Sequence, residues 1–151
     1  MIRYFAYGSN MDPARMRDRI GRIPEAQGAE LPGYVLRFNK RAQKHPTIGF
    51  ANVAPDPEGV VYGILYDIAE DDLSAIDHYE GATRGHYARE SVEVFLADGS
   101  EIEAVAYIAC PEWIEDGLLP TGDYLNHLLA GAEYLPPAYV DWLAEHEVGG
   151  K

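Results

Sequence analysis

Residues 59–66 read GVVYGILY and form an extended segment that is apolar on both of its faces. A strand of this kind is typical of the centre of a sheet that is covered on both sides. Gly63 lies inside the segment, which indicates a bend or a place where another part of the chain approaches the backbone closely. We therefore expect this strand to lie at the centre of the fold.

The segments around this strand predict a mainly antiparallel sheet with flanking helices. An alternating apolar pattern on both sides of Asp98-Gly99 predicts a hairpin. Asp12 with Pro13, and Asp67 with Glu70, are typical of the first residues of helices. The expected strands cover residues 2–7, 34–38, 51–53, 59–66, 92–96 and 102–108, and the expected helices cover 13–20, 67–80, 121–134 and 136–147. Because these elements do not alternate as βαβ units, an α+β fold with a curled sheet or small barrel fits their order best.

The size and composition of the chain predict one globular domain over residues 1–151. Its single cysteine, Cys110, cannot form an internal disulfide and suits a reducing compartment. The first residues do not form a basic-then-apolar signal, and no apolar run reaches the length of a membrane span. We expect a soluble, cytoplasmic protein that does not associate with membranes.

The net charge of −13 argues against nucleic acid as the main partner. The charge is uneven, because residues 1–45 hold nine basic and four acidic residues, a net charge of +5. The favoured interpretation is that this basic part complements the acidic remainder of the chain, and the alternative is a surface for an anion or RNA. Arg15, Arg17 and Arg19 are not expected to share one face of their helix, and Asn39–Gly49 is expected to be an exposed, basic loop. The basic residues could still bias a nearby pocket toward an anionic ligand.

Glu80 stands where the helix predicted over residues 67–80 should be apolar. Leu73 and Ile76 define the apolar side of this helix, and Glu80 is seven residues after Leu73 on the same side. Burial of a carboxylate, together with its place at a helix C-terminus, raises the pKa and favours acid–base chemistry near neutral pH. The alternative is a helix-end glutamate that bends toward water beside Gly81.

Gly8-Ser9-Asn10 separates the first predicted strand from the first predicted helix. Such a segment can be an ordinary turn, or it can bring backbone N–H groups and small polar side chains to an anionic ligand. Tyr87 and Tyr124 could belong to the same site or could be packing tyrosines. The five histidines lack a convincing ligand spacing, so we expect no metal site.

In their order and spacing, these motifs are similar to those of the γ-glutamylcyclotransferase-like family. The resemblance extends over almost the whole chain, and it implies a small β-barrel surrounded by helices. It also implies an enzyme that cyclises a γ-glutamyl group to 5-oxoproline. The similar segments are Tyr7-Gly8-Ser9-Asn10, residues 59–66, Ile76 to Gly81, Tyr87-Ala88-Arg89, Tyr124 to Ala132, and Leu135 to Tyr139.

The resemblance also implies the roles of single residues. The loop Tyr7–Asn10 would hold the α-amino and α-carboxylate end of the glutamyl group, and Glu80 would be the catalytic acid and base. Tyr87 and Tyr124 would line the pocket. No cofactor is expected, because the substrate's own α-amine attacks the γ-carbonyl carbon.

The sequence does not define the amine that is released or the oligomeric state. Glutathione, γ-glutamyl amino acids, γ-glutamyl amines and a γ-glutamyl-protected metabolite all stay open as substrates. Gln43–Gly49 is where we expect family members with different leaving groups to diverge. A non-catalytic small-molecule-binding module that uses the same pocket is the alternative to an enzyme.

Overall fold

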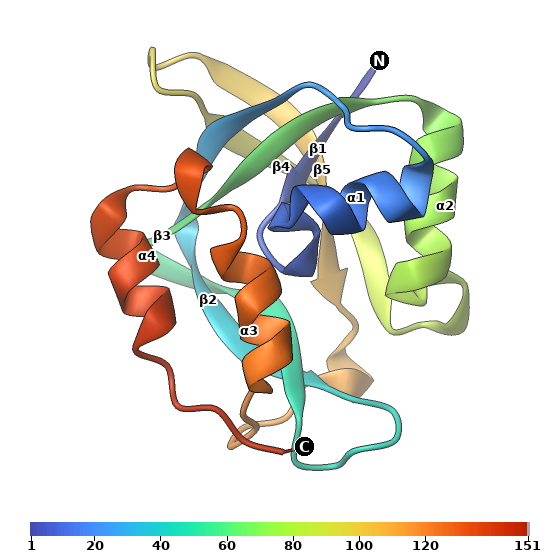
Figure 1. Ribbon diagram of the computed structural model, residues 1–151, viewed down its shortest axis with the longest axis vertical. Helices are drawn as coiled ribbons and strands as arrows, with labels where there is room; N and C mark the ends of the chain where they lie inside the picture. Colours follow the sequence, from blue (N-terminus) through green and yellow to red (C-terminus); the bar gives the residue numbers. More distant parts are fainter. Residues whose placement is uncertain (151) are drawn as a thin grey trace.

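The computed structural model describes residues 1–150, which contain a closed five-stranded barrel with four α-helices around it (Figure 1). The strands follow the order β1-β3-β2-β4-β5, and β5 closes the barrel by pairing with β1. The β1–β5 pair is parallel and the other pairs are antiparallel, so the expected curled α+β fold is confirmed. The strands are β1 (Ile2–Ala6), β2 (Ala26–Arg41), β3 (Gly49–Ile68), β4 (Tyr87–Phe95) and β5 (Glu101–Ala109).

One long strand, β3, replaces two strands expected from the sequence. It pairs with β1 through its last five residues, Ile64–Ile68, and with β2 along most of its length. Pro55 and Pro57 lie in its exposed middle part, where a missing N–H group costs little. The prediction of two short strands was wrong because these prolines and Gly59 are typical of loops, whereas pairing with the 16-residue β2 keeps the chain extended.

Gly63 lies where β3 passes very close to the end of its neighbour β1. A Cβ atom at this position would collide with the carbonyl oxygen of Ala6 and would lie 2.8 Å from the Phe5 ring. The close approach that the sequence predicts at Gly63 is therefore confirmed. It allows β1 to pack tightly against the strand with which it pairs.

Helix α2 (Glu70–Glu80) begins later than the sequence predicts. The amide of Ala69 donates to the carboxylate of Asp72 at 3.0 Å, so these residues form the start of the helix. Asp67, predicted to cap it, belongs to β3 and forms an ion pair with Arg3 at 2.7 Å. The predicted end is confirmed, because Gly81 adopts a left-handed conformation with φ of 68°.

Helix α1 (Pro13–Ile20) is capped as expected, and the two helices near the C-terminal end of the chain are shorter than expected. The carboxylate of Asp12 accepts from the amide of Ala14 at 3.0 Å, and the hydroxyl of Thr121 accepts from the amide of Tyr124 at 3.1 Å. The predicted helices over residues 121–134 and 136–147 are each reduced to eight residues. The helices are α1 (Pro13–Ile20), α3 (Gly122–Leu129) and α4 (Pro137–Ala144).

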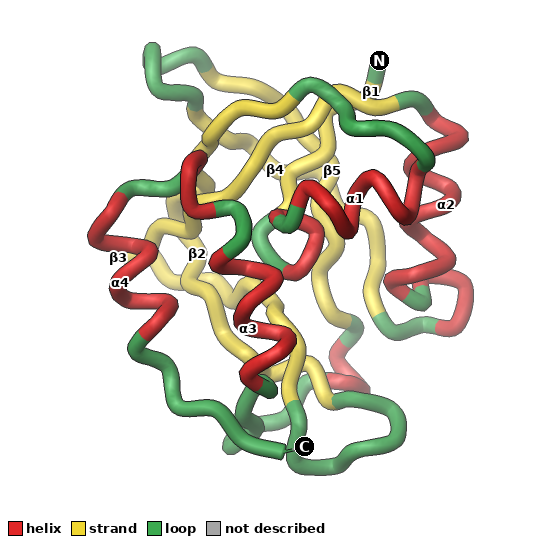
Figure 2. Tube along the Cα trace, in the orientation of Figure 1, coloured by secondary structure: helices red, strands yellow, loops and turns green. Residues whose placement is uncertain are grey.

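The helices pack in two pairs, as the trace in Figure 2 shows. Helix α1 contacts α2, α3 contacts α4, and the single turn Ser9–Met11 contacts both α1 and α3. The Tyr4 ring stacks on Tyr66 with centroids 6.1 Å apart and meets Tyr107 edge-on at 5.7 Å, and the Tyr4 and Tyr66 hydroxyls bond to Asn10 of the N-terminal turn. This packing fixes the N-terminal turn between two helices. None of the helices in residues 1–150 has the length and apolar character needed to cross a bilayer.

Candidate active site

A pocket of about 230 Å³ lies beside the N-terminal turn and continues into an inner cavity of about 20 Å³. Both spaces are lined by Ser9, Glu80, Tyr87 and Tyr124. The inner cavity is also lined by Tyr7, Gly8 and Asn10. The fold thus brings all seven candidate residues from the sequence around one continuous space.

A larger, shallower groove of about 550 Å³ lies between β2, β4 and the segment before α4. None of the seven candidate residues lines it. Its lining includes two carboxylates, Glu30 and Glu133, but no basic group. The smaller pocket is therefore the better candidate for chemistry, because it combines acidic, basic and phenolic groups.

The N-terminal turn is held rigidly by its own polar groups. The side-chain amide of Asn10 donates to the Tyr4 hydroxyl at 2.9 Å, and its oxygen accepts from Arg19 at 2.7 Å. The backbone oxygen of Asn10 accepts from the Tyr66 hydroxyl at 2.7 Å. Asn10 is thus placed at the cavity, but its side chain already has partners and serves to shape the turn.

Gly8 allows Tyr124 to approach the turn. A Cβ atom on Gly8 would lie 3.2 Å from the Tyr124 hydroxyl and 3.1 Å from Cβ of Ala51. Ser9 is the residue of this turn that lines both the pocket and the inner cavity. The turn therefore presents backbone and a small hydroxyl side chain to a ligand.

Glu80 is the last residue of α2 and the one carboxylate among the pocket residues. Burial raises the pKa of its carboxyl group, and the positive charges of Arg19, Arg15 and Lys40 oppose this rise. The residue keeps partial access to solvent because it faces the pocket. A carboxyl group in this setting can exchange protons with a bound ligand near neutral pH.

Helix α2 is fastened to the barrel one turn before Glu80. Arg89 on β4 donates twice to the carboxylate of Asp77, at 2.9 and 2.6 Å. The hydroxyl of Tyr107 on β5 donates to the same carboxylate at 2.6 Å. These bonds from two strands define where the end of α2 lies, and so where Glu80 lies.

Three tyrosines complete the inner cavity. The Tyr7 hydroxyl donates to the backbone oxygen of Tyr107, and the Tyr87 hydroxyl donates to the backbone oxygen of Ala51 at 2.7 Å. The Tyr124 hydroxyl accepts from the amide of Ala51 at 3.0 Å. Burial raises the pKa of each of these phenols, so they are neutral donors at neutral pH.

The sequence did not identify the basic residues of the pocket. Arg15 and Arg19, one helical turn apart, both line it, whereas Arg17 does not, so the three arginines of α1 do not all share one face. Lys40, predicted to lie in an exposed loop, is 3% exposed and belongs to β2. Leu36 and Phe38 are also buried, so the alternation along β2 was the signal that could have found Lys40.

Some basic residues pair with the acidic part of the chain, as the favoured interpretation of the charge pattern requires. Arg3 pairs with Asp67, and Arg22 pairs with Asp72. The basic residues of the pocket, in contrast, are not paired with acidic residues of the described chain. Within residues 1–150 no ion pair forms at Arg15, Arg19, Lys40 or Arg84.

The chain is thus a small α+β barrel protein with a pocket lined by acidic, basic and phenolic side chains. Residues 60–143, more than half of the chain, match the AIG2-like family, and the chain belongs to that family. It is 36% identical to AIG2-like protein C of Arabidopsis thaliana over 98 residues, which cover 64% of this chain and 52% of that protein.

Relatives outside plants connect the chain with γ-glutamylcyclotransferases. It is 30% identical to the γ-glutamylcyclotransferase of Homo sapiens over 108 residues, 70% of this chain and 57% of that protein. A solved structure of a γ-glutamyl cyclotransferase matches with a TM-score of 0.86 and 26% identity, and covers 99% of this chain and 90% of that one. The chain spans between half and three fifths of the length of these two curated relatives. The family resemblance seen in the sequence is thus confirmed.

Proposed function

We propose that this protein is a γ-glutamylcyclotransferase that converts a γ-glutamyl compound into 5-oxoproline and a free amine or amino acid. Membership of the AIG2-like family and the similarity to named γ-glutamylcyclotransferases support a function of this kind. The observation that carries the proposal is the position of Glu80. Its carboxyl group lines both the pocket and the inner cavity, beside the turn that contains Ser9.

The proposed substrate lies with its glutamyl group toward the inner cavity. The turn Gly8–Asn10 would bind the end that carries the α-amino and α-carboxylate groups, because N–H groups can donate to the carboxylate and the hydroxyl oxygen of Ser9 can accept from the α-ammonium group. Tyr7, Tyr87 and Tyr124 would surround the glutamyl chain. A bent chain in this space holds the α-nitrogen near the γ-carbonyl carbon, which can lower the barrier by several kcal/mol.

The reaction moves two protons from the α-nitrogen to the leaving nitrogen. The Glu80 carboxylate takes the first proton from the α-ammonium group, and the free amine then attacks the γ-carbonyl carbon to form the five-membered ring. As the bond to the leaving nitrogen breaks, protonated Glu80 gives its proton to that nitrogen. The regenerated carboxylate takes the second proton from the ring nitrogen and returns it to the released amine, which leaves as an ammonium group, and the raised pKa of Glu80 suits these transfers.

The direct test is incubation of the purified chain with a panel of γ-glutamyl compounds and measurement of 5-oxoproline. The panel should include glutathione, γ-glutamyl amino acids and γ-glutamyl amines, because the leaving group is not defined. We expect at least one compound to be converted. Saturable binding without product over long incubation would instead identify a non-catalytic binding module and overturn the proposal.

A further inference from the structure

Lys40 is a buried cation with unfilled hydrogen-bonding capacity. It is 3% exposed, and its ammonium nitrogen lies 2.7 Å from Nδ1 of His86, its one hydrogen-bond partner within residues 1–150. An ammonium group has three hydrogens to donate, so two remain for a ligand or water. The charge of Glu80 acts on Lys40, but within residues 1–150 no ion pair joins the two. A buried charge without a direct ionic partner is costly, and such groups are typical of binding sites.

His86 and three aromatic rings hold this ammonium group in place. Burial, followed by the charge of Lys40, lowers the pKa of His86 and so favours the neutral ring, and a charged Lys40 requires Nδ1 to be the acceptor of this bond. The ammonium nitrogen lies 4.5 Å from the Trp113 ring centroid and 5.6 Å from those of Phe50 and Tyr87. These rings attract a cation without neutralising it.

The position of Lys40 separates it from the glutamyl end of the proposed substrate. Lys40 lines the pocket of about 230 Å³ but not the inner cavity, which the turn Gly8–Asn10 lines. Glu80 lies between the two spaces and lines both. A substrate whose glutamyl group lies in the pocket, with its α-amino and α-carboxylate end toward the turn Gly8–Asn10, therefore extends its leaving group into the part of the pocket beside Lys40.

This outer space is strongly cationic, although the whole chain carries a net charge of −13. Four cations line it, and Glu80 is the one carboxylate that faces them. None of the four is used in an ion pair within residues 1–150. They are Arg15, Arg19, Lys40 and Arg84. Arg19 already donates to Asn10, whereas the exposed Arg84 and the buried Lys40 are available to a ligand.

We propose that Lys40, assisted by Arg84, binds a carboxylate on the released amine, and that the enzyme therefore selects γ-glutamyl compounds with an anionic leaving group. This inference rests on the proposed cyclotransferase function and names the residue that determines its leaving-group specificity. Burial lowers the pKa of Lys40 to about 8, so most of the group is charged at neutral pH. A charged hydrogen bond to a carboxylate in this pocket is stronger than one to a neutral amide.

The test compares two substrates of the same shape, γ-glutamylalanine and γ-glutamylalaninamide, which differ only in the charge of the leaving group. We expect the wild type to favour γ-glutamylalanine in kcat/KM. Lys40→Met keeps the length and apolar stem of the side chain and should reduce that preference roughly tenfold to hundredfold. The loss should lie mainly in KM for γ-glutamylalanine, with little change for the amide.

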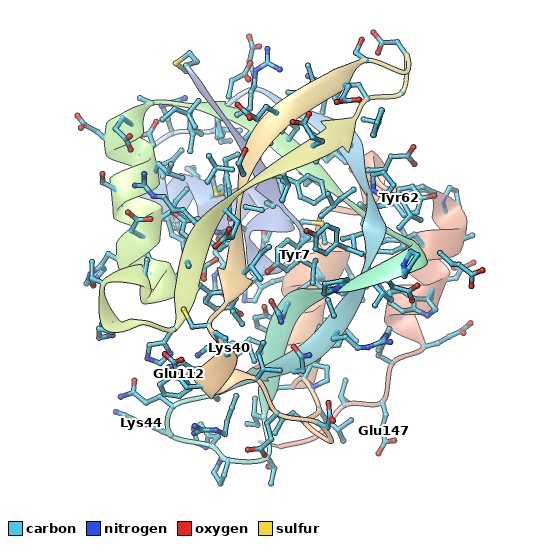
Figure 3. All side chains as sticks on the ribbon, turned by 180° about the vertical axis from the view of Figure 1, so that it is seen from behind. Tyr7, Lys40, Lys44, Tyr62, Glu112 and Glu147 are labelled. Atoms are coloured by element: carbon cyan, nitrogen blue, oxygen red, sulfur yellow. The ribbon has the colours of Figure 1, made fainter. Side chains whose placement is uncertain are left out.

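Two further variants keep the test decisive if Lys40→Met folds poorly. Arg84→Gln changes an exposed residue and should reduce the preference by a smaller factor. Arg37→Gln is the matched control, because Arg37 is an exposed cation of β2 that lines neither space, and it should leave the preference unchanged. Lys44 (Figure 3) does not serve as the control, because it lies in Gln43–Gly49, the segment expected to diverge with the leaving group. Binding of both compounds to Glu80→Gln, measured by calorimetry, gives the same comparison without turnover.

The outcomes separate this inference from the proposed function. If the wild type converts both compounds and Lys40→Met loses activity equally on both, Lys40 acts on a part common to both substrates and the inference is wrong. A wild type that favours the amide in both binding and turnover would also overturn it. If no γ-glutamyl compound of the panel is converted, the proposed function fails, and the calorimetric preference still tests the role of Lys40.

Discussion

Tyr87 and Tyr124 bind opposite polar groups of the same residue, Ala51 on β3. The hydroxyl of Tyr87 donates to the Ala51 carbonyl oxygen at 2.7 Å, and the hydroxyl of Tyr124 accepts from the Ala51 amide at 3.0 Å. The hydrogen of Tyr87 is therefore used within the fold, whereas that of Tyr124 is available to a ligand. The two pocket phenols therefore differ in whether they can donate a hydrogen bond to a ligand.

This difference predicts unequal effects of two similar substitutions on activity. Tyr87→Phe leaves the Ala51 carbonyl without its donor, and Tyr124→Phe leaves the Ala51 amide without its acceptor, so each should lower the free energy of unfolding by about 1–2 kcal/mol. Tyr124→Phe also removes a hydrogen that is available to a ligand, and should lower kcat/KM for a γ-glutamyl substrate by about tenfold or more. Urea unfolding and 5-oxoproline formation measure the two effects. Equal losses of activity in both variants would contradict the distinction.

Gly63 should tolerate no larger side chain. A methyl group there would collide with Ala6 and with the Phe5 ring, so Gly63→Ala should lower the free energy of unfolding by about 1–3 kcal/mol or more. Gly122, at the start of α3, does not have positive φ, and a methyl group added to it would have no neighbouring atom within 4 Å. Gly122→Ala should therefore be neutral or slightly stabilising. Thermal unfolding of the two variants provides the comparison.

The raised pKa of Glu80 predicts a particular dependence of stability on pH. The folded chain holds the Glu80 proton more tightly than the unfolded chain does, so this group's contribution to stability falls as pH rises above the ordinary carboxyl pKa. Glu80→Gln has no such proton. Between about pH 4 and pH 7, the free energy of unfolding of the wild type should therefore fall relative to that of Glu80→Gln.

Urea unfolding at the two pH values measures this change. Glu133→Gln, at a glutamate outside the pocket, is the control and should show no comparable change in the difference from wild type. A wild type that gains stability relative to Glu80→Gln as pH rises would show that the pKa of Glu80 is lowered on folding. It would then be a poor proton donor to the leaving amine.

The local features of the fold could be predicted because they depend on neighbouring residues. Asp12 with Pro13 defines the start of α1, Gly81 defines the end of α2, and Asp98-Gly99 defines the hairpin turn. The extent of β3 could not be predicted in this way. Its continuity through Pro55 and Pro57 depends on pairing with β2, a contact between distant parts of the chain.

The same division holds for the candidate site. Glu80 was found because it interrupts the apolar side of α2, and the turn Gly8–Asn10 was found from its composition. Lys40 was missed because it was assigned to a loop by its polar neighbours rather than to the alternation of Leu36 and Phe38. The Lys40 side chain lines the pocket because the pairing of β2 with β3 continues as far as Arg41 and Gly49.

The most direct test of the account is the rate of 5-oxoproline formation by Glu80→Gln at saturating γ-glutamyl substrate, compared with wild type. The variant keeps the shape of the side chain but can neither take nor return the proton. We predict that kcat falls by about a hundredfold to ten-thousandfold while substrate binding, measured by calorimetry, changes little. A variant that forms 5-oxoproline at the wild-type rate would show that Glu80 does not carry the proton and would contradict the proposed mechanism.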